Sequence, residues 1–302
     1  MDIKQLNTLV TLHECGFNVT ETAEKLFVVQ SAVSQQLSRL EKELGTRLFV
    51  RAGKRLVGLT EAGQMVLDYA HDALIIRDNI LAVGEDKEGE VTALRLGATH
   101  AQARYVLPAV IKEFRQRYPD STFQIMQGTP SELVEMAVTD KVDMAICTEQ
   151  LGQYPLLKAF SCYRWNRRLV APEGHPVFSS KPMSLESICK YPLITYTYGF
   201  TGAEHIDSIL NRAGLSPQIV LTAVDTDVIK TYVREELGVG IIAGMAWSGE
   251  DEGLQSFDLS GLLPWETTWV AYHRDKFLKS YQVHFLELIT SMVLDNGVIR
   301  TA

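Results

Sequence analysis

The sequence predicts a multidomain α/β protein, in which an N-terminal winged helix-turn-helix precedes one long linker helix and a C-terminal two-lobed α/β domain. Three observations predict this fold class. Three short helical patterns and a basic segment come first, a single heptad pattern runs through residues 62–83, and strand patterns alternate with helix patterns from Val91 onward. We expect the domains at residues 1–60, 61–90 and 91–302.

The composition is typical of a soluble globular chain. It has 302 residues, of which 46% are hydrophobic and 22% are charged, with a formal net charge of −8. No apolar run reaches the about 18–20 residues of a membrane span, and the first residues enter a helical pattern directly, so we expect a cytoplasmic protein without a membrane partner. The four cysteines form no CxxC pair, which favours reduced thiols over a disulfide framework or a metal site, and we expect no cofactor.

The first two helices are read from apolar spacing and a capping pattern. Apolar residues at helical spacing predict a helix over residues 3–15. Asn18, followed by Glu21, resembles a capping box that opens a second helix. We expect the second helix to face inward with Ala23, Leu26 and Phe27.

The third helix, over residues 30–45, is the predicted reading helix. The tight connection between the second and third helices is typical of a helix-turn-helix. Its outward face offers short donors and acceptors and one guanidinium, which suit base edges and phosphates. These candidate DNA-binding residues are Gln30, Ser31, Ser34, Gln35, Ser38 and Arg39.

A basic segment follows the reading helix. Residues 46–60 include Arg51, Lys54 and Arg55 but no acid, although the whole chain is acidic. The pattern predicts two short strands around Ala52–Gly53–Lys54, a wing whose cations would contact DNA phosphates. The alternative for this segment alone is a solvated basic loop.

Thr60 is the predicted cap of a long helix with a narrow apolar seam. The seam residues recur at steps of four and three: Ala62, Val66, Tyr69, Ala73, Ile76, Ile80 and Val83. Such a seam needs a partner helix, either from the same chain or, as we favour, from a second copy. A dimer would place two reading helices on neighbouring DNA half-sites. The helix passes into the charged linker at residues 84–90.

Strand and helix patterns alternate through the rest of the chain, which predicts parallel sheets with helices on both faces. The strands are expected at 92–97, 122–127, 143–147, 157–162, 167–171, 192–196, 218–222, 239–243 and 267–272. The helices are expected at 101–117, 130–139, 184–189, 202–213, 226–236 and 280–294. We expect lobe I at 91–163 and 268–302 and lobe II at 164–267, with a ligand in the cleft between them.

These motifs resemble a known family over the whole chain. The stretch "TAEKLFVVQSAVSQQLSRLEKELGTRLFVRAGKRLVGLTEAG", residues 22–63, is similar to the DNA-binding signature of the LysR-type transcriptional regulators. In the C-terminal domain, "THAQARYVLP", "QGTP", "WNRRLV", "YPLITYTYGFTG" and "DTDVIKTYV" resemble the CysB/Cbl subgroup of cysteine-regulon activators.

The resemblance implies both a function and partners. It implies an effector domain of the periplasmic-binding-protein type and a homo-oligomer, commonly a dimer of dimers, at promoters of sulfur-assimilation genes. Double-stranded promoter DNA is the implied partner, with RNA polymerase as a further candidate. Acetylserine is the implied inducer, and sulfate or thiosulfate is the opposing anion. Carried over by matching position, the anion site would be Thr99, Gln102, Thr148, Trp165 and Thr201.

The residues themselves support a ligand site built from neutral donors. Thr99 and Gln102 stand at one predicted helix start, Thr201 at a second and Thr129 at a third. Helix N-termini that meet in one cleft supply spare N–H groups and aligned dipoles, which bind a small anion without a salt bridge. The alternative is that each threonine simply caps its own helix. His100 is a weaker candidate, because a packed or capping histidine explains it as well.

Two positions depart from the family pattern. Ala101 stands where the subgroup usually has Thr, so one hydroxyl of the anion site is missing and the preferred anion is open. Val29 stands where the family usually has Ser or Thr, which moves the cap of the reading helix to Ser31 or weakens it.

Three other functions compete with this interpretation. An enzyme could use Asp143, Glu149, Asp225 or Asp227, but no nucleophile or base stands at a recognisable spacing, so we expect no catalysis. A solute-binding protein would suit the two lobes, but it predicts an export signal and no DNA-binding module. A LysR-type regulator of organosulfur or aromatic acid metabolism is the serious alternative.

Overall fold

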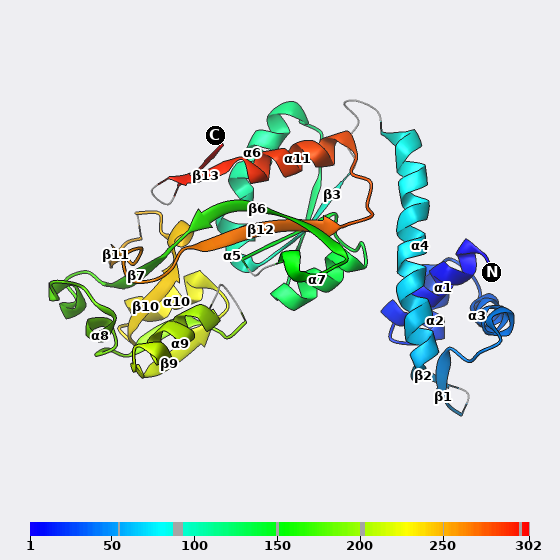
Figure 1. Ribbon diagram of the computed structural model, residues 1–302, viewed down its shortest axis with the longest axis horizontal. Coiled ribbons are helices and arrows are strands. Elements are labelled where there is room, and N and C mark those ends of the chain that lie inside the picture. The colour runs from blue at the N-terminus through cyan, green and yellow to red at the C-terminus, as the bar shows by residue number, and fades with distance from the viewer. Residues whose placement is uncertain are drawn as a thin grey trace. The chain divides into compact units, whose positions relative to one another are not determined.

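The computed structural model describes residues 1–53, 55–86, 93–148, 151–199, 203–249, 251–295 and 298–301. The chain divides into two compact units. One unit is Met1–Asp86 with Asp275–Phe277, and the other is Lys87–Arg274 with Leu278–Ala302. We refer to them as the N-terminal unit and the effector domain and describe each by itself (Figure 1).

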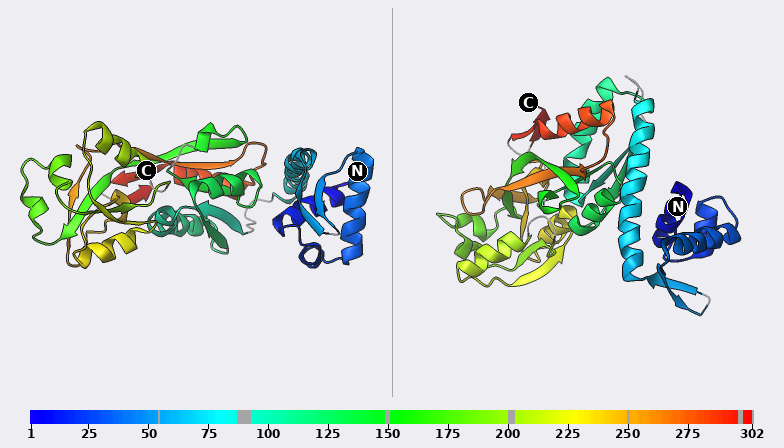
Figure 2. Two further views of the ribbon diagram at one scale, coloured as in Figure 1. Left: turned by 90° about the horizontal axis from the view of Figure 1, so that it is seen from below. Right: turned by 45° about the vertical axis from the view of Figure 1, so that its right-hand side comes forward.

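The N-terminal unit is a three-helix cluster with a β-hairpin and one long helix (Figures 1 and 2). Its elements are α1 (Ile3–Glu14), α2 (Val19–Lys25), α3 (Gln30–Leu44), β1 (Phe49–Ala52), β2 (Arg55–Leu59) and α4 (Glu61–Glu85). The core that joins them includes the fully buried Leu9, Leu12, Val33, Leu40 and Leu48. The hairpin strands are antiparallel, as the predicted wing requires.

Local capping explains where these helices begin and end. The Asn18 side chain accepts hydrogen bonds from Thr20 N and Glu21 N at the start of α2, as the sequence predicts. Gly45, in a left-handed conformation with φ of 67°, ends α3. Thr60 caps α4 by accepting from Gly63 N at 3.0 Å.

The expected inward face of α2 is wrong at one residue. Phe27 is 96% exposed, whereas Ala23 is buried. The helix stops at Lys25, and Phe27 takes a positive φ of 54°, which directs its side chain outward from the turn before α3.

The long helix α4 divides its apolar residues between two faces. Leu67, Ala70 and Ile75 are buried within the unit. Two residues of the predicted seam, Val66 and Ala73, pack partly against the core. The seam residues Tyr69, Ile76, Ile80 and Val83 remain exposed in the single chain. Most of the seam is therefore free to contact another helix.

The effector domain contains two five-stranded sheets (Figure 1). The first has the order β4-β3-β5-β12-β6 and the second β11-β7-β10-β8-β9. The strands of the first are β3 (Leu94–Ala98), β4 (Phe123–Gln127), β5 (Met144–Cys147), β6 (Leu157–Trp165) and β12 (Glu266–His273). Those of the second are β7 (Arg167–Pro172), β8 (Leu193–Tyr196), β9 (Ile219–Ala223), β10 (Val239–Ala243) and β11 (Leu254–Asp258).

Helices pack against both sheets. They are α5 (His100–Tyr105), α6 (Leu107–Arg117), α7 (Pro130–Val138), α8 (Leu185–Ile188), α9 (Ala203–Arg212), α10 (Thr226–Arg234) and α11 (Ser280–Thr290), followed by the hairpin β13 (Met292–Asp295) and β14 (Val298–Thr301). The sequence did not predict β11 or this hairpin. The predicted single helix at 101–117 is two helices, because the chain bends at Val106 and Pro108 lacks the N–H that a continuous helix would use.

The sheets are mixed, which corrects the expectation of parallel sheets. β3 runs parallel to β4 and β5, but β12 is antiparallel to β5 and β6. In the second sheet, β7 is antiparallel to β10 and β11. The antiparallel strands β6, β7 and β12 are those next to the crossings between the sheets.

The chain crosses between the sheets at two points that lie side by side. Only Asn166 separates β6 from β7, and the return is made just before β12. The Asn166 side chain donates to Leu263 O at 3.1 Å and accepts from Arg167 N at 2.6 Å. Asn166 therefore ties the outgoing crossing to the returning one.

Candidate functional site

The outward face of α3 presents the side chains that the sequence selects for DNA. Gln30, Ser31, Ser34, Gln35, Ser38 and Arg39 are all exposed. Gln30 Nε2 donates to Thr20 Oγ1 at 2.9 Å, which fixes the first side chain of the helix against α2. The helix begins at Val29 without a side-chain cap, the weaker of the two expected outcomes. Its first N–H groups are therefore left for solvent or for a phosphate.

The β1–β2 hairpin presents cations beside this face. Arg51 and Arg55 are exposed, and Gly53 supplies the positive φ of 63° in the turn. Arg51 lies 3.3 Å from the Glu41 carboxylate, so part of its charge is balanced within the unit. Lys54 lies outside the described residues.

The candidate anion site lies at the carboxyl ends of β3 and β5. These parallel strands are in register with Ala98 opposite Ile146. Thr99 and Thr148 each follow the end of one of these strands and are 4% and 8% exposed. Loops at the carboxyl ends of adjacent parallel strands are the usual place for ligands in α/β sheets.

Thr99 keeps its hydroxyl free of helix capping. It is the N-cap of α5 in an extended conformation, yet its side chain makes no cap hydrogen bond. The first N–H groups of α5 have no carbonyl partner within the helix, as at any helix start. The buried hydroxyl and these N–H groups are the neutral donors that the sequence predicts for an anion.

Gln102 and Trp165 add two buried donors. Gln102 is 1% exposed, and its Nε2 donates to Thr268 Oγ1 at 3.3 Å. Tyr163 Oη donates to Gln102 Oε1. Trp165 is fully buried at the end of β6, and its Nε1 has no hydrogen-bond partner among the residues that the structure describes. A buried N–H without a partner is costly, so a bound acceptor would stabilise this arrangement.

Other candidates have different surroundings. Thr129 caps α7: its Oγ1 accepts from Glu132 N at 3.2 Å, and its N–H donates to the Glu132 carboxylate at 2.7 Å. That is the simple capping alternative, and the carboxylate would repel an anion. Ala101 is buried and offers no polar group. Thr201 lies outside the described residues.

His100 faces the opposite sheet's helices. Its Nε2 lies 3.0 Å from Asp225 Oδ2 at the start of α10. Asp225 also caps α10 by accepting from Asp227 N at 2.7 Å. His100 is thus engaged in an ion pair that joins α5 to α10.

A cavity of about 1010 Å³ adjoins Thr148 and is lined from both sheets' elements. Thr148 and Ser131 contribute hydroxyls, and His205 and Arg212 on α9 contribute basic groups. Tyr154, Trp265 and Trp269 supply an aromatic wall. The lining suits a small organic anion rather than a large apolar ligand.

A buried ion pair underlies this cavity. Arg167 NH2 lies 2.9 Å from Glu266 Oε1, and the two side chains are 0% and 7% exposed. His205 Nδ1 lies 2.8 Å from the same carboxylate oxygen. The Arg167 guanidinium also lies 5.3 Å from the centre of the Trp165 ring. Sequence spacing gave no sign of this pair, because Arg167 and Glu266 are brought together only by the two crossings.

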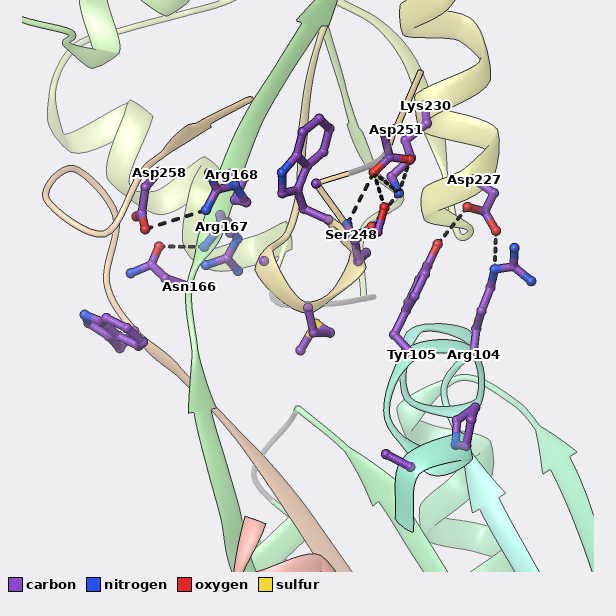
Figure 3. Close-up of a pocket in the computed structure, with 18 residues that line it drawn as sticks. Arg104, Tyr105, Asn166, Arg167, Arg168, Asp227, Lys230, Ser248, Asp251 and Asp258 are labelled. Atoms are coloured by element: carbon purple, nitrogen blue, oxygen red, sulfur yellow. Dashed lines mark hydrogen bonds and ion pairs between the residues drawn. The ribbon is translucent and has the colours of Figure 1, made fainter. Parts of the chain in front are cut away.

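A second cavity, of about 960 Å³, lies between α5–α6 and α10 (Figure 3). Its carboxylates are paired with neighbouring groups. Asp227 accepts from Tyr105 Oη at 2.7 Å and pairs with Arg104, as Figure 3 shows. Asp251 accepts from Lys230 Nζ at 2.9 Å. These contacts join helix α5, which carries Thr99 and Gln102, to α10.

The acids that an enzyme could use are committed to structural contacts. Asp143 Oδ1 accepts from Arg95 NH2 at 2.8 Å, and Asp225 and Asp227 make the contacts just described. Glu149 lies outside the described residues. Over the described part of the chain, no helix is both long and apolar enough to cross a membrane.

Comparison with protein families identifies both parts of the chain. A model described as the LysR substrate binding domain matches residues 87–293. A model described as a bacterial regulatory helix-turn-helix protein of the lysR family matches residues 3–64.

Named relatives are similar over nearly the whole chain. The chain is 40% identical to the HTH-type transcriptional regulator CysB of Haemophilus influenzae, over 100% of this chain and 94% of that protein. It is 39% identical to the regulator SsuR of Burkholderia cenocepacia, over 95% and 94% of the two chains. It is 40% identical to the regulator cbl of Escherichia coli, over 95% and 92%. These relatives are named as transcriptional regulators and not as enzymes.

Solved structures show the same architecture. The cofactor-binding domain of the Cbl transcriptional regulator is 40% identical, with a TM-score of 0.64 over 68% of this chain and 90% of that one. Full-length OxyR from Pseudomonas aeruginosa has a TM-score of 0.74 at 19% identity, over 95% and 96% of the two chains. Full-length CbnR complexed with its target DNA has a TM-score of 0.62 at 18% identity, over 96% and 99%. The last two likenesses concern the fold alone.

Proposed function

Because the chain belongs to the LysR family of bacterial transcriptional regulators, we propose that it controls promoters of sulfur-assimilation and cysteine-biosynthesis genes in the cytoplasm. A small anionic effector in the effector domain sets its activity, with acetylserine as inducer and sulfate or thiosulfate as the opposing anion. The similarity to the CysB, Cbl and SsuR regulators supports this choice of pathway.

Regulators of this family bind promoter DNA and form oligomers. For this chain, α3 would enter the major groove with Ser34, Gln35, Ser38 and Arg39 toward the base edges. The exposed Arg51 and Arg55, with Lys54, would contact phosphates on the flanking backbone. The exposed part of the α4 seam would pair two chains, and two such pairs would form a dimer of dimers. RNA polymerase is the partner through which a bound activator would act.

One observation carries the effector proposal: Trp165 Nε1 is a fully buried donor with no partner in the described structure. Thr99 adds a buried hydroxyl that caps nothing, and Gln102 adds an amide N–H. Thr148 and Thr201 are proposed to complete the site. A set of neutral donors can hold an ionised anion through charge-assisted hydrogen bonds.

The site also suggests how a bound effector reaches the rest of the molecule. Helix α5 carries Thr99 and Gln102 near its start and contacts α10 through His100, Arg104 and Tyr105. A ligand that moves α5 would therefore change the contacts between the two sheets' elements. The resulting shift between lobes is proposed to alter the spacing and bending of the bound DNA. A ligand shifts this equilibrium only by its differential affinity for the two arrangements.

Titration calorimetry with the full chain tests the proposal. Sulfate, thiosulfate and acetylserine should bind, and acetylserine should change the footprint of the chain on a sulfur-gene promoter. A footprint that is identical with and without every one of these ligands would refute the proposal.

A second candidate effector is an organic sulfonate or aromatic acid. The cavity of about 1010 Å³ beside Thr148 is far larger than an inorganic anion requires, and Tyr154, Trp265 and Trp269 line it. The same titrations with an alkanesulfonate and benzoate distinguish the two candidates.

A further inference from the structure

A closed polar cluster connects the anion site to the two crossing strands. Tyr163 on β6, Gln102 on α5 and Thr268 on β12 are 5%, 1% and 0% exposed. Tyr163 Oη donates to Gln102 Oε1, and Gln102 Nε2 donates to Thr268 Oγ1 at 3.3 Å. Thr268 stands directly opposite Tyr163 in the β12–β6 register. We call these three residues the Gln102 triad.

The triad determines which polar atoms remain for a ligand. A carboxamide has two N–H groups and one oxygen, and a freely rotating amide could present either end. Here the oxygen accepts from Tyr163 and one N–H is given to Thr268. The hydrogen that remains on Gln102 is the second N–H of its Nε2. Gln102 is thus held as a donor.

The phenol is suited to this role over a wide pH range. Burial raises the pKa of Tyr163 far above its ordinary value, and the hydrogen bonds with Thr268 and Gln102 oppose this effect more weakly. The phenol therefore keeps its proton and continues to donate to Gln102 Oε1. A donor fixed on that oxygen keeps the oxygen directed away from the anion.

The same strand positions the second donor. Tyr163 and Trp165 are two residues apart on β6, so their side chains leave the same face. Trp165 Nε1 has no partner in the described part of the chain. Glu266, which stands opposite Trp165, would repel an anion, but its carboxylate is paired with Arg167 at 2.9 Å. The face is left with uncommitted donors and a neutralised acid.

We propose that Tyr163 and Thr268 are positioning residues that hold Gln102 as a donor, and that the site therefore selects fully ionised anions over anions that carry a proton. This inference rests on the proposed function. Sulfate has no proton at neutral pH, so every oxygen can accept. Inorganic phosphate carries at least one O–H, which finds no acceptor in such a site.

Binding of sulfate and of inorganic phosphate to the full chain at pH 7 tests the inference. We expect sulfate to bind at least about tenfold more tightly than phosphate, the scale of one unsatisfied buried hydrogen-bonding group. In the variant Tyr163→Phe, Gln102 can turn its oxygen toward the phosphate O–H, so the preference should fall by about tenfold. A merely structural role would weaken both anions equally and leave the ratio unchanged.

Tyr196→Phe is the matched control. Tyr196 is also buried, and its hydroxyl contacts Thr226 Oγ1 at 2.6 Å and accepts from Ala243 N at 3.0 Å, outside the triad. It should keep the sulfate-to-phosphate ratio of the unmodified chain. If Tyr163→Phe does not fold, Thr268→Val tests the same triad, because it removes the acceptor of Gln102 Nε2.

Failure of the inference and failure of the proposed function give different results. An unmodified chain that binds sulfate, together with a triad variant of unchanged anion preference, overturns the positioning role alone. An unmodified chain that binds sulfate no more tightly than phosphate also overturns the inference while keeping an anion site. A chain that binds none of sulfate, thiosulfate and acetylserine overturns the proposed function and this inference with it.

Discussion

Thr99 and Thr129 both begin helices, but the structure gives their hydroxyls different tasks. The Thr129 hydroxyl caps α7, whereas the Thr99 hydroxyl makes no cap hydrogen bond and is buried beside the candidate anion site. Thr→Val keeps the shape of the side chain and removes only the hydroxyl. The same substitution at these two positions should therefore affect different properties.

We expect Thr99→Val to weaken anion binding by about 1.5–3 kcal/mol, the value of a hydrogen bond to a charged group, which corresponds to about 10- to 150-fold in Kd. Its unfolding free energy should change little, because no hydrogen bond to a protein group is removed. Thr129→Val should lower the unfolding free energy by about 0.5–2 kcal/mol, the cost of removing an N-cap, and leave sulfate affinity unchanged.

Titration calorimetry with sulfate and denaturant unfolding of both variants are the measurements. Each variant serves as the control for the other, because they share the chemistry of the substitution. The reasoning is refuted if Thr99→Val binds sulfate as tightly as the unmodified chain, or if Thr129→Val loses affinity without losing stability.

The remaining predictions concern the seam, the hairpin and the buried phenols. Ile80→Glu should reduce the oligomer in sedimentation experiments, because Ile80 is 71% exposed on the unpaired part of the seam; an unchanged mass would exclude the seam as the contact. Neutralising Arg51 and Lys54 should lower the slope of log binding against log salt by about one for each phosphate that the hairpin no longer neutralises, and an unchanged slope would mean that they touch no phosphate. Burial raises the pKa of the Tyr105, Tyr163 and Tyr196 phenols. Their contribution to stability should therefore be complete below about pH 10, where unfolded tyrosines begin to ionise, and should fall above it. Thermal melts between pH 7 and 11 check this, and a flat Tm through pH 10 would contradict it.

The local fold was readable from the sequence because short-range chemistry sets it. Asn18 and Thr60 cap the helices that they were expected to cap, and Gly45 ends α3. Strand β10 begins and ends as predicted, at Val239 and Ala243. Caps and alternation act within a few residues, so no knowledge of the tertiary fold is needed.

Other features depend on contacts between distant segments. The antiparallel direction of β12 follows from the return crossing and not from its own pattern. Phe27 has the composition of a core residue, but a positive φ turns it outward. Nothing in the helix-start pattern separates Thr99 from Thr129; only the packing of α5 against the first sheet does.

The candidate anion site was predicted in part. Thr99 and Thr148 could be placed at neighbouring strand ends from the strand–helix alternation. The surrounding groups could not, because Tyr163, Thr268 and Glu266 reach the site only through the pairing of β6 with β12. That pairing joins segments about a hundred residues apart in the chain, and no local pattern records it.

The central claim is that an anion is bound by buried, uncharged donors, among which the Trp165 indole N–H is the clearest. The chain contains four tryptophans, so their indole N–H resonances can be followed individually by 15N-labelled NMR. Addition of sulfate should move the Trp165 resonance downfield in proportion to the sites occupied, and Trp165→Phe should remove that signal. Saturable binding of sulfate without any shift of the Trp165 resonance would contradict the account.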